Sequence, residues 1–224
     1  MKVFKIQENG INMVWKVADT GCVRLLHFSA LPFDERTIVD EYEEQGFKLL
    51  ELEAAGYDRP DERHGTKYIV TAPGYRMQYA DHKDYRNETG RKLEITTQDQ
   101  ESGLQAVNHF QFFDGIAVVR CWCEVSNMGK ETQTIQYVST FNLNGVEKEG
   151  LLSRDEKIRI GVVHNSWQRE LLLQEYTLPE VGLQNSQVNI PIRSSKAFEL
   201  TNTGNWSTKH YLPMGYISNT ETGS

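Results

Sequence analysis

The sequence lacks any long apolar segment. It contains no run of about 18 apolar residues, the length that a helix needs to cross a bilayer. Its first residues, MKVFKIQENG, carry charge within a few positions and lack the apolar centre of a signal peptide. These two absences predict a protein that does not cross a membrane and that stays in the cytoplasm.

Positive charge is also scarce. The 224 residues include 24 Lys and Arg against 31 Asp and Glu, which gives a formal net charge of -7. Proteins that bind nucleic acids or acidic membranes rely on clustered Lys and Arg to neutralise phosphates. The composition therefore argues against both kinds of partner.

Cysteine is rare, with three residues and no Cys-x-x-Cys pair. This spacing gives no signature of a structural zinc site. Cys121 and Cys123 share one face of an expected strand, where such neighbours are too far apart and too parallel for an unstrained disulfide. We expect three reduced thiols that serve as packing residues.

The common motifs of catalysis and cofactor binding are missing as well. The sequence has no Gly-x-x-x-x-Gly-Lys-Ser/Thr loop, no Gly-x-Gly-x-x-Gly fingerprint, no Gly-x-Ser-x-Gly elbow and no His-Glu-x-x-His. The six histidines stand singly, which is typical of surface or packing residues. We therefore expect no cofactor and no metal site.

The sequence is rich in segments whose residue types and alternation predict β-strands. β-Branched and aromatic residues dominate Ile116–Val125, and both faces of this segment are largely apolar, which predicts a central strand covered on both sides. Ser126–Lys130 has turn chemistry, and Thr134–Leu143 is expected to return as the second strand of a hairpin.

Further short alternating segments, separated by Gly, Pro, Asn and Asp, predict more strands. They are expected at Val3–Ile6, Ile11–Val17, Cys22–Phe28, Phe47–Glu53, Tyr75–Tyr79, Leu93–Thr97, Leu104–Phe113, Lys157–Asn165, the second half of Trp167–Tyr176, Val188–Ile192 and Lys196–Thr203. Asp81–Arg91 is predicted as a turn, and Leu93–Thr97 as a sheet edge. Because no linker or repeat divides the chain, we predict one all-β antiparallel sandwich domain over residues 1–224, with little helix.

Two features could contact a ligand on residue type alone. The loop Gly56–Gly74 is dense in Asp, Glu, Arg and His; it is either a solvated connection, which the residue types favour, or a ligand-facing or interface loop. Trp15, Trp122, Trp167 and Trp206 could stack on a sugar ring, but core packing is expected for each, most clearly for Trp122.

Three segments resemble the N-terminal domain of the α-galactosidases of glycoside hydrolase family 36. They are FFDGIAVVRCWCEVSNMGKETQTIQYVSTFNL at Phe112–Leu143, TLPEVGL at Thr177–Leu183 and TNTGNWSTKHYLPMGYISN at Thr201–Asn219. Their order along the chain matches the family. The third segment, with its G-x-W-S-x-K-x-Y-L-P-M-G pattern, is the most distinctive.

The resemblance implies a β-supersandwich that precedes a catalytic (β/α)8 barrel in the intact enzyme. Members of the family are retaining hydrolases that release terminal α-linked galactose from oligosaccharides such as melibiose and raffinose, with two Asp residues of the barrel as the catalytic pair. The resemblance also implies a homo-oligomer, in which loops of the N-terminal domain reach a substrate pocket. On this basis Asp61, Arg63 and His64 are expected to contact an α-galactoside, and Trp206 is a second candidate.

The chain departs from the family because it shows no alternation of strands and helices that could form a barrel. We therefore assign no catalytic residue within it and expect the chain alone to lack hydrolase activity. The alternative is a stand-alone β-sandwich that binds carbohydrate or protein. The wide spacing of the tryptophans disfavours the aromatic face that a carbohydrate-binding module presents. Nothing in the sequence separates hydrolysis from galactosyl transfer.

Overall fold

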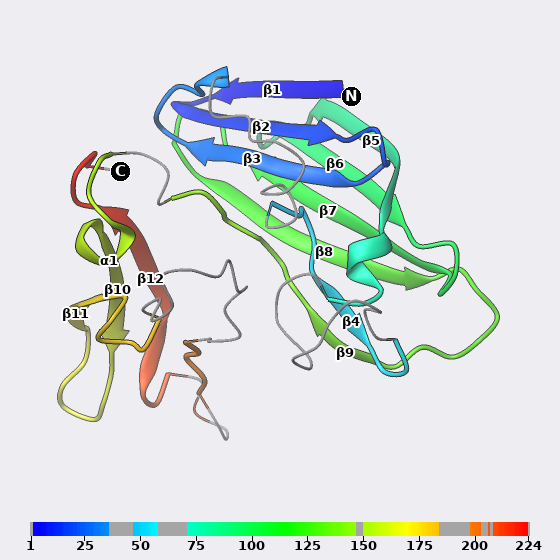
Figure 1. Cartoon of the computed structure of the whole chain (residues 1–224). Coiled ribbons are helices and arrows are strands. Elements are labelled where there is room, and N and C mark those ends of the chain that lie inside the picture. The colour runs from blue at the N-terminus through cyan, green and yellow to red at the C-terminus, as the bar shows by residue number, and fades with distance from the viewer. Residues whose placement is uncertain are drawn as a thin grey trace. The chain divides into compact units, whose positions relative to one another are not determined.

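The computed structural model describes residues 2–35, 47–57, 71–146, 150–183, 198–202, 206 and 208–223. These residues are mostly strand and fall into two compact units, Met1–Gly145 and Val146–Ser224, which are described separately (Figure 1). The predicted all-β fold is confirmed, whereas one domain across both units stays a prediction. No helix in these ranges has the length and apolar character needed to span a membrane.

The first unit opens with an antiparallel meander of β1 (Lys2–Glu8), β2 (Ile11–Val17) and β3 (Val23–Ser29), in that order. Asn9 and Gly10 turn the chain between β1 and β2 with φ of 49° and 83°. Asn and Gly are the residue types that tolerate this left-handed conformation best. The alternation of apolar residues predicts this sheet, and all three strands are confirmed.

A second sheet in this unit has four antiparallel strands in chain order. They are β5 (Gln78–Arg86), β6 (Arg91–Gln98), β7 (Leu104–Phe112) and β8 (Val119–Asn127). Asp114 and Gly115 lie in the turn between β7 and β8, and Gly115 has a φ of 79°. An Asp-Gly dipeptide favours such a tight turn, and β7 and β8 form a hairpin around it.

The predicted hairpin of the two central segments is wrong. β8 ends the strand order of its sheet next to β7, while β9 (Ile135–Val138) pairs with β4 (Leu52–Ala54). β8 is also not covered on both sides, because Arg120 and Glu124 on its second face are exposed. The apolar composition of β8 reflects packing of one face against the core and shielding of Trp122 by its neighbours on the other.

Other expectations also differ from the structure. The strand predicted at Tyr75–Tyr79 is mostly wrong, because Gly74–Arg76 forms a 3-10 helix and β5 starts at Gln78. The turn predicted at Asp81–Arg91 is confined to residues 87–90, because β5 extends to Arg86 as a solvent-exposed edge strand whose side chains are polar for that reason. Leu93–Thr97 is not at an edge, since β6 lies between β5 and β7. Residues 198–202 form no strand, and Val188–Ile192 lies outside the described residues.

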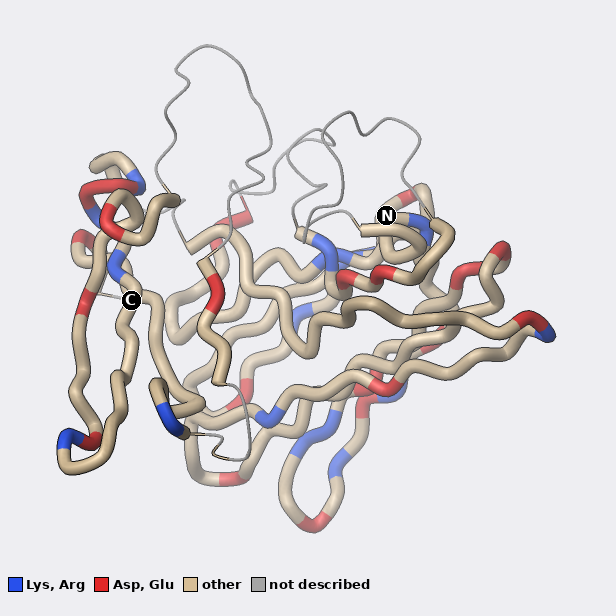
Figure 2. The backbone as a smooth tube through the Cα atoms, turned by 90° about the horizontal axis from the view of Figure 1, so that it is seen from below, with Lys and Arg blue, Asp and Glu red and all other residues tan. Residues whose placement is uncertain are grey.

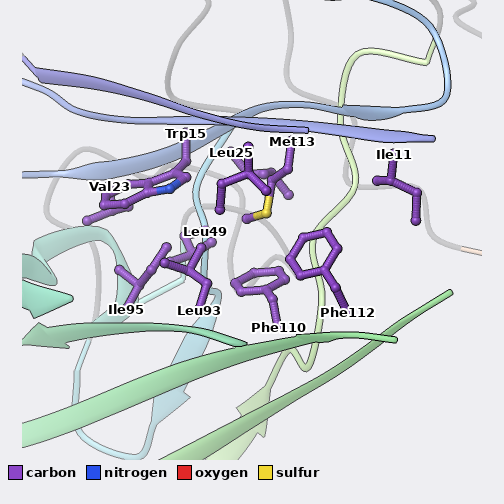
Figure 3. Packing of buried hydrophobic residues seen from close by; sticks show 11 residues of the cluster. Ile11, Met13, Trp15, Val23, Leu25, Leu49, Leu93, Ile95, Phe110 and Phe112 are labelled. Atoms are coloured by element: carbon purple, nitrogen blue, oxygen red, sulfur yellow. The ribbon is translucent and has the colours of Figure 1, made fainter. Parts of the chain in front are cut away.

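The core of the first unit lies between the sheet of β1–β3 and the sheet of β5–β8 (Figure 3). Met13 and Trp15 of β2 point toward Leu93 of β6 and Phe110 of β7, and these four side chains are 0%, 1%, 1% and 2% exposed. Trp15 also stacks on Phe4 with ring centroids 3.9 Å apart. Burial of a side chain of this size contributes about 1.5–3 kcal/mol, so this cluster is the main source of stability of the unit.

All three cysteines are free thiols, as predicted. Cys121 and Cys123 pack against the buried clusters of the first unit, and burial raises the pKa of each thiol to about 12. A thiol with such a pKa stays protonated at neutral pH and is a poor nucleophile. Both residues therefore serve packing.

A buried ion pair holds the turn before β7. Asp99 is 3% exposed and accepts hydrogen bonds from Nε and Nη2 of Arg76, at 3.1 and 2.8 Å. It also accepts bonds from the backbone N–H and the hydroxyl of Ser102, at 3.0 and 2.6 Å. Burial by itself would raise the pKa of Asp99, but the hydrogen bonds from Arg76 and Ser102 outweigh burial and lower it.

Acidic and basic residues are interspersed along the described backbone (Figure 2). Arg91 pairs with Asp84 at 2.6 Å, and Lys92 pairs with Glu94 at 2.8 Å. These cations are neutralised within the sheet rather than offered to phosphates.

The second unit contains the short helix α1 (Arg154–Lys157) and a three-stranded antiparallel sheet. The strands are β11 (Leu172–Thr177), β10 (Ile158–His164) and β12 (Tyr211–Asn219), in that order. The strand predicted in the second half of Trp167–Tyr176 is confirmed as β11. Because β10 pairs with both neighbours, the turn that precedes β11 and the segment that precedes β12 meet at the end of β10.

Candidate functional site

The structure describes one of the four residues predicted to contact a substrate. Asp61, Arg63 and His64 lie outside the described residues, so their role stays a prediction. Trp206 is described and belongs to the second unit. The surroundings of Trp206 therefore define the candidate site.

A hollow of about 310 Å³ lies at the end of β10. It is lined by His164, Asn165, Ser166, Arg169, Leu172, His210 and Tyr211. These residues supply aromatic rings, a guanidinium, an amide and a hydroxyl, and none of them is a carboxylic acid. Ligand pockets range upward from roughly 300 Å³, so the hollow suits a small ligand.

Hydrogen bonds between segments give the hollow its shape. The backbone N–H of Asn165 donates to the carbonyl of His210 at 2.9 Å, and Nδ2 of Asn165 donates to the carbonyl of Thr208 at 2.5 Å. The ring of His164 and the hydroxyl of Tyr176 meet at 2.8 Å. The wall is thus built on the ends of three paired strands, which limits its freedom to collapse.

Trp167 and Trp206 are not among the residues that line this hollow, but both lie in segments next to it. Trp167 lies in the turn between Ser166 and Arg169, which both line the hollow, and Nε1 of Trp206 donates to the hydroxyl of Thr208 at 3.1 Å. The two indole centroids are 6.4 Å apart with the planes at 81°. Trp167 is 76% exposed and Trp206 is 45% exposed. Core packing is therefore wrong for both, because each follows or precedes a strand instead of facing a core.

The other two tryptophans have different surroundings. Trp15 lies in the core, as predicted. Trp122 is half-buried rather than in the core, and its ring stacks on that of His109 with centroids 4.5 Å apart. Nζ of Lys92 and the guanidinium carbon of Arg120 lie 5.0 and 5.3 Å from the centroid of Trp122. Protein groups therefore already contact this indole ring.

His109 is the one strongly buried histidine on that sheet face. It is 6% exposed, and its ring nitrogens lie 3.4 Å from Glu94 and 3.3 Å from Glu124. Burial, followed by the charge of Lys92, lowers the pKa of His109. The ring is thus neutral at physiological pH and acts as a packing surface for Trp122. Within the described ranges, no three His, Cys, Asp or Glu side chains come together in a way that could hold a metal ion.

Comparison with known proteins gives matches among solved structures alone. No family model and no curated protein matches the sequence. The galactosidase domain of the α-galactosidase-sucrose kinase AgaSK is similar with a TM-score of 0.57 at 12% identity, over 79% of this chain and 28% of that chain. The glycoside hydrolase family 36 α-galactosidases AgaA and AgaB from Geobacillus stearothermophilus each give a TM-score of 0.50 at 15% identity.

These similarities establish a shared fold. They cover 79% of this chain and 28% and 27% of the AgaA and AgaB chains, so this chain spans little more than a quarter of the length of the enzymes it matches. The fold expected from the resemblance in sequence is thereby confirmed.

Proposed function

We propose that this chain is the non-catalytic N-terminal domain of an α-galactosidase, which acts beside a (β/α)8 barrel that carries the reaction. The observation that supports this most is the common fold with the AgaSK galactosidase domain, over 79% of this chain and 28% of that one. The proposed reaction of the whole protein is hydrolysis of terminal α-galactosyl groups from oligosaccharides such as melibiose and raffinose.

The chemistry of the described residues supports a role without catalysis. A retaining glycosidase needs two carboxyl groups about 5 Å apart on either side of the scissile bond. None of the described residues that line the hollow at the end of β10 is a carboxylic acid. The buried carboxylates of the first unit are engaged elsewhere: Asp99 binds Arg76 and Ser102, and Glu51 accepts two hydrogen bonds from Thr71 at 2.9 and 2.8 Å.

Exposed apolar residues of the second unit support a role in assembly. Leu172 and Leu173 of β11 are 49% and 52% exposed, and Met214 and Ile217 of β12 are 59% and 51% exposed. Because successive side chains of a strand point to opposite faces, these residues leave apolar side chains exposed on both faces of the small sheet. Such exposure is typical of surfaces that another protein part covers. We propose that the barrel domain or a second subunit covers them in the intact enzyme.

The reading frame beyond codon 224 tests this proposal. We expect it to continue into alternating strands and helices that form a barrel with an Asp at a strand end. A frame that continues into an unrelated fold would refute the proposed function.

A stand-alone carbohydrate-binding β-sandwich is the second candidate. It is favoured by the exposure of Trp167 and Trp206 side by side, which the spacing of the tryptophans in the sequence does not suggest. The same reading frame separates the two candidates, because a binding module needs no barrel.

The loop that contains Asp61 is proposed to contact the substrate, because carboxylate and guanidinium groups suit the paired donors and acceptors of sugar hydroxyls. In the barrel-containing enzyme, we expect Asp61→Ala to raise KM for raffinose several-fold more than KM for p-nitrophenyl α-galactoside, which lacks the distal sugars. Steady-state kinetics of both substrates measure this. Glu88→Ala, at an exposed turn of the first unit, is the matched control. Equal and negligible changes on both substrates would reject a contact role for this loop.

A further inference from the structure

We propose that the hollow at the end of β10, together with Trp167 and Trp206, is a saccharide-binding site of its own, which holds a neutral pyranose ring without cleaving it. The choice of an α-galactoside as the sugar rests on the proposed function. The evidence for the site is independent of that function and consists of the exposure of the two indoles, the groups in the wall and the position of the hollow.

The first argument is the free indole surface. Trp167 is 76% exposed and Trp206 is 45% exposed, although indole is one of the largest apolar groups in proteins. Their edge-to-face arrangement, at 6.4 Å and 81°, leaves two planes at nearly a right angle. A pyranose has an apolar face of C–H groups and a rim of hydroxyls, so it can cover one indole while its rim reaches polar groups nearby.

Comparison with the other tryptophans shows that this exposure is specific to the second unit. Trp15 is 1% exposed and stacks on Phe4. Trp122 stacks on His109 and has the cation of Lys92 near its ring. Neither of these rings is available to a ligand, so they serve as internal controls.

The second argument is the set of polar groups in the wall. Oδ1 of Asn165 is buried and has no hydrogen-bond donor among the described residues, whereas its Nδ2 donates to the carbonyl of Thr208. An acceptor in such a position is rarely left without a donor. The guanidinium of Arg169 and the ring of His210 line the same hollow and can donate. Paired donors and acceptors of this kind match sugar hydroxyls.

The third argument excludes other ligand classes. A metal ion would call for carboxylate ligands, and no described residue of the wall supplies one. An organic cation could stack on the indoles, but Arg169 in the same wall would repel it. A purely apolar ligand would leave Arg169 and Asn165 without partners. An inorganic anion would use Arg169 but gain nothing from the two indoles. A neutral sugar is the class that uses both the rings and the polar wall.

The position of the hollow supports a site that exists before the ligand arrives. Its wall stands on the ends of β10, β11 and β12, and Asn165 is tied to the segment before β12 through both its backbone and its side chain. Groups fixed in this way lose little freedom on binding, which favours affinity for a small ligand.

The test uses the 224-residue chain with melibiose as the probe. Two-dimensional NMR of the four indole N–H groups, assigned by single Trp substitutions, reports each ring separately. We expect saturable shifts for Trp167 and Trp206 and none for Trp15 or Trp122. Unchanged indole signals up to the solubility limit of melibiose, or shifts at Trp122 alone, would overturn the proposal.

Substitutions provide the second measurement. Trp167→Ala and Arg169→Leu are each expected to weaken melibiose binding about tenfold or more, a loss that a single well-placed contact can cause. Leu151→Ala removes a side chain that is 99% exposed in the same unit and is expected to leave the affinity unchanged. Circular dichroism of each variant checks that the fold is kept. Equal affinity in all three variants, or saturable binding of inorganic phosphate with none of melibiose, would contradict a saccharide site.

The result of the melibiose-binding test can be distinguished from the result of the reading-frame test of the proposed function. A failure to bind melibiose leaves the reading frame and the scaffold role untouched. Binding by a chain whose frame leads to no barrel would support this site and refute the α-galactosidase domain.

Discussion

Trp15→Ala is expected to lower the free energy of unfolding of the first unit by about 3–5 kcal/mol, the range for removal of a large aromatic side chain from a packed core. Trp15 is 1% exposed, stacks on Phe4 at 3.9 Å and lies 5.2 Å from the ring of His82. Both neighbours would lose their packing partner, and the space left between the two sheets is too deep for the backbone to close. Urea unfolding followed by circular dichroism measures the change.

Two variants make this test specific. Trp15→Phe keeps an aromatic ring in the core and is expected to cost clearly less than Trp15→Ala. Trp167→Ala removes an indole that is 76% exposed and is expected to change stability by no more than about 0.5 kcal/mol, as surface substitutions do. A loss of stability at Trp167 as large as that at Trp15 would mean that the sandwich core is not where the structure places it.

Asp99→Ala is the second substitution with a large expected effect, about 3 kcal/mol of destabilisation at pH 7. It leaves the guanidinium of Arg76 and the N–H of Ser102 without their buried acceptor, and the loss of one partner from a buried pair costs about 3–5 kcal/mol. The lower end applies because the side chain of Arg76 is 20% exposed and water can reach it. Urea unfolding of both proteins gives the difference.

The effect of Asp99 should depend on pH in a defined direction. The pKa of Asp99 is lowered in the folded state, so the stability that its charge contributes is complete above the unfolded-state pKa of about 3.9. That contribution is lost as the pH falls through the lower folded-state pKa. The difference between the wild type and Asp99→Ala should therefore be constant from pH 7 to pH 5 and shrink below about pH 4. A difference that grows on acidification would contradict the buried ion pair.

The local sequence pattern was sufficient to predict the strands that are joined by turns with characteristic residues. Asn9 and Gly10 mark the first hairpin, and Asp114 and Gly115 mark the hairpin of β7 and β8. The partner of β9 could not be read in the same way, because β4 lies far away in the sequence and pairing over such a distance leaves no local trace. The polar residues of β5 led to the prediction of a turn, because an exposed edge strand has the residue composition of a loop.

The candidate site was predictable only in part. Trp206 is marked by its place in a distinctive segment, but Trp167 lies far from it in the sequence, before β11, and has no motif of its own. The two rings meet because β10 pairs with both β11 and β12, and no sequence period encodes that neighbourhood. The sequence also does not show that these two tryptophans are exposed, because a tryptophan in a strand-rich sequence more often lies in a core. The role of Asp61, Arg63 and His64 stays a prediction.

The proposed function requires that this chain support a reaction that the barrel performs. The most direct measurement is the release of p-nitrophenol from p-nitrophenyl α-galactoside by the purified 224-residue chain. We predict no release above that of buffer at any protein concentration, because the described residues that line the hollow at the end of β10 offer a sugar no pair of carboxyl groups. Release that rises in proportion to the concentration of the purified chain would contradict the account.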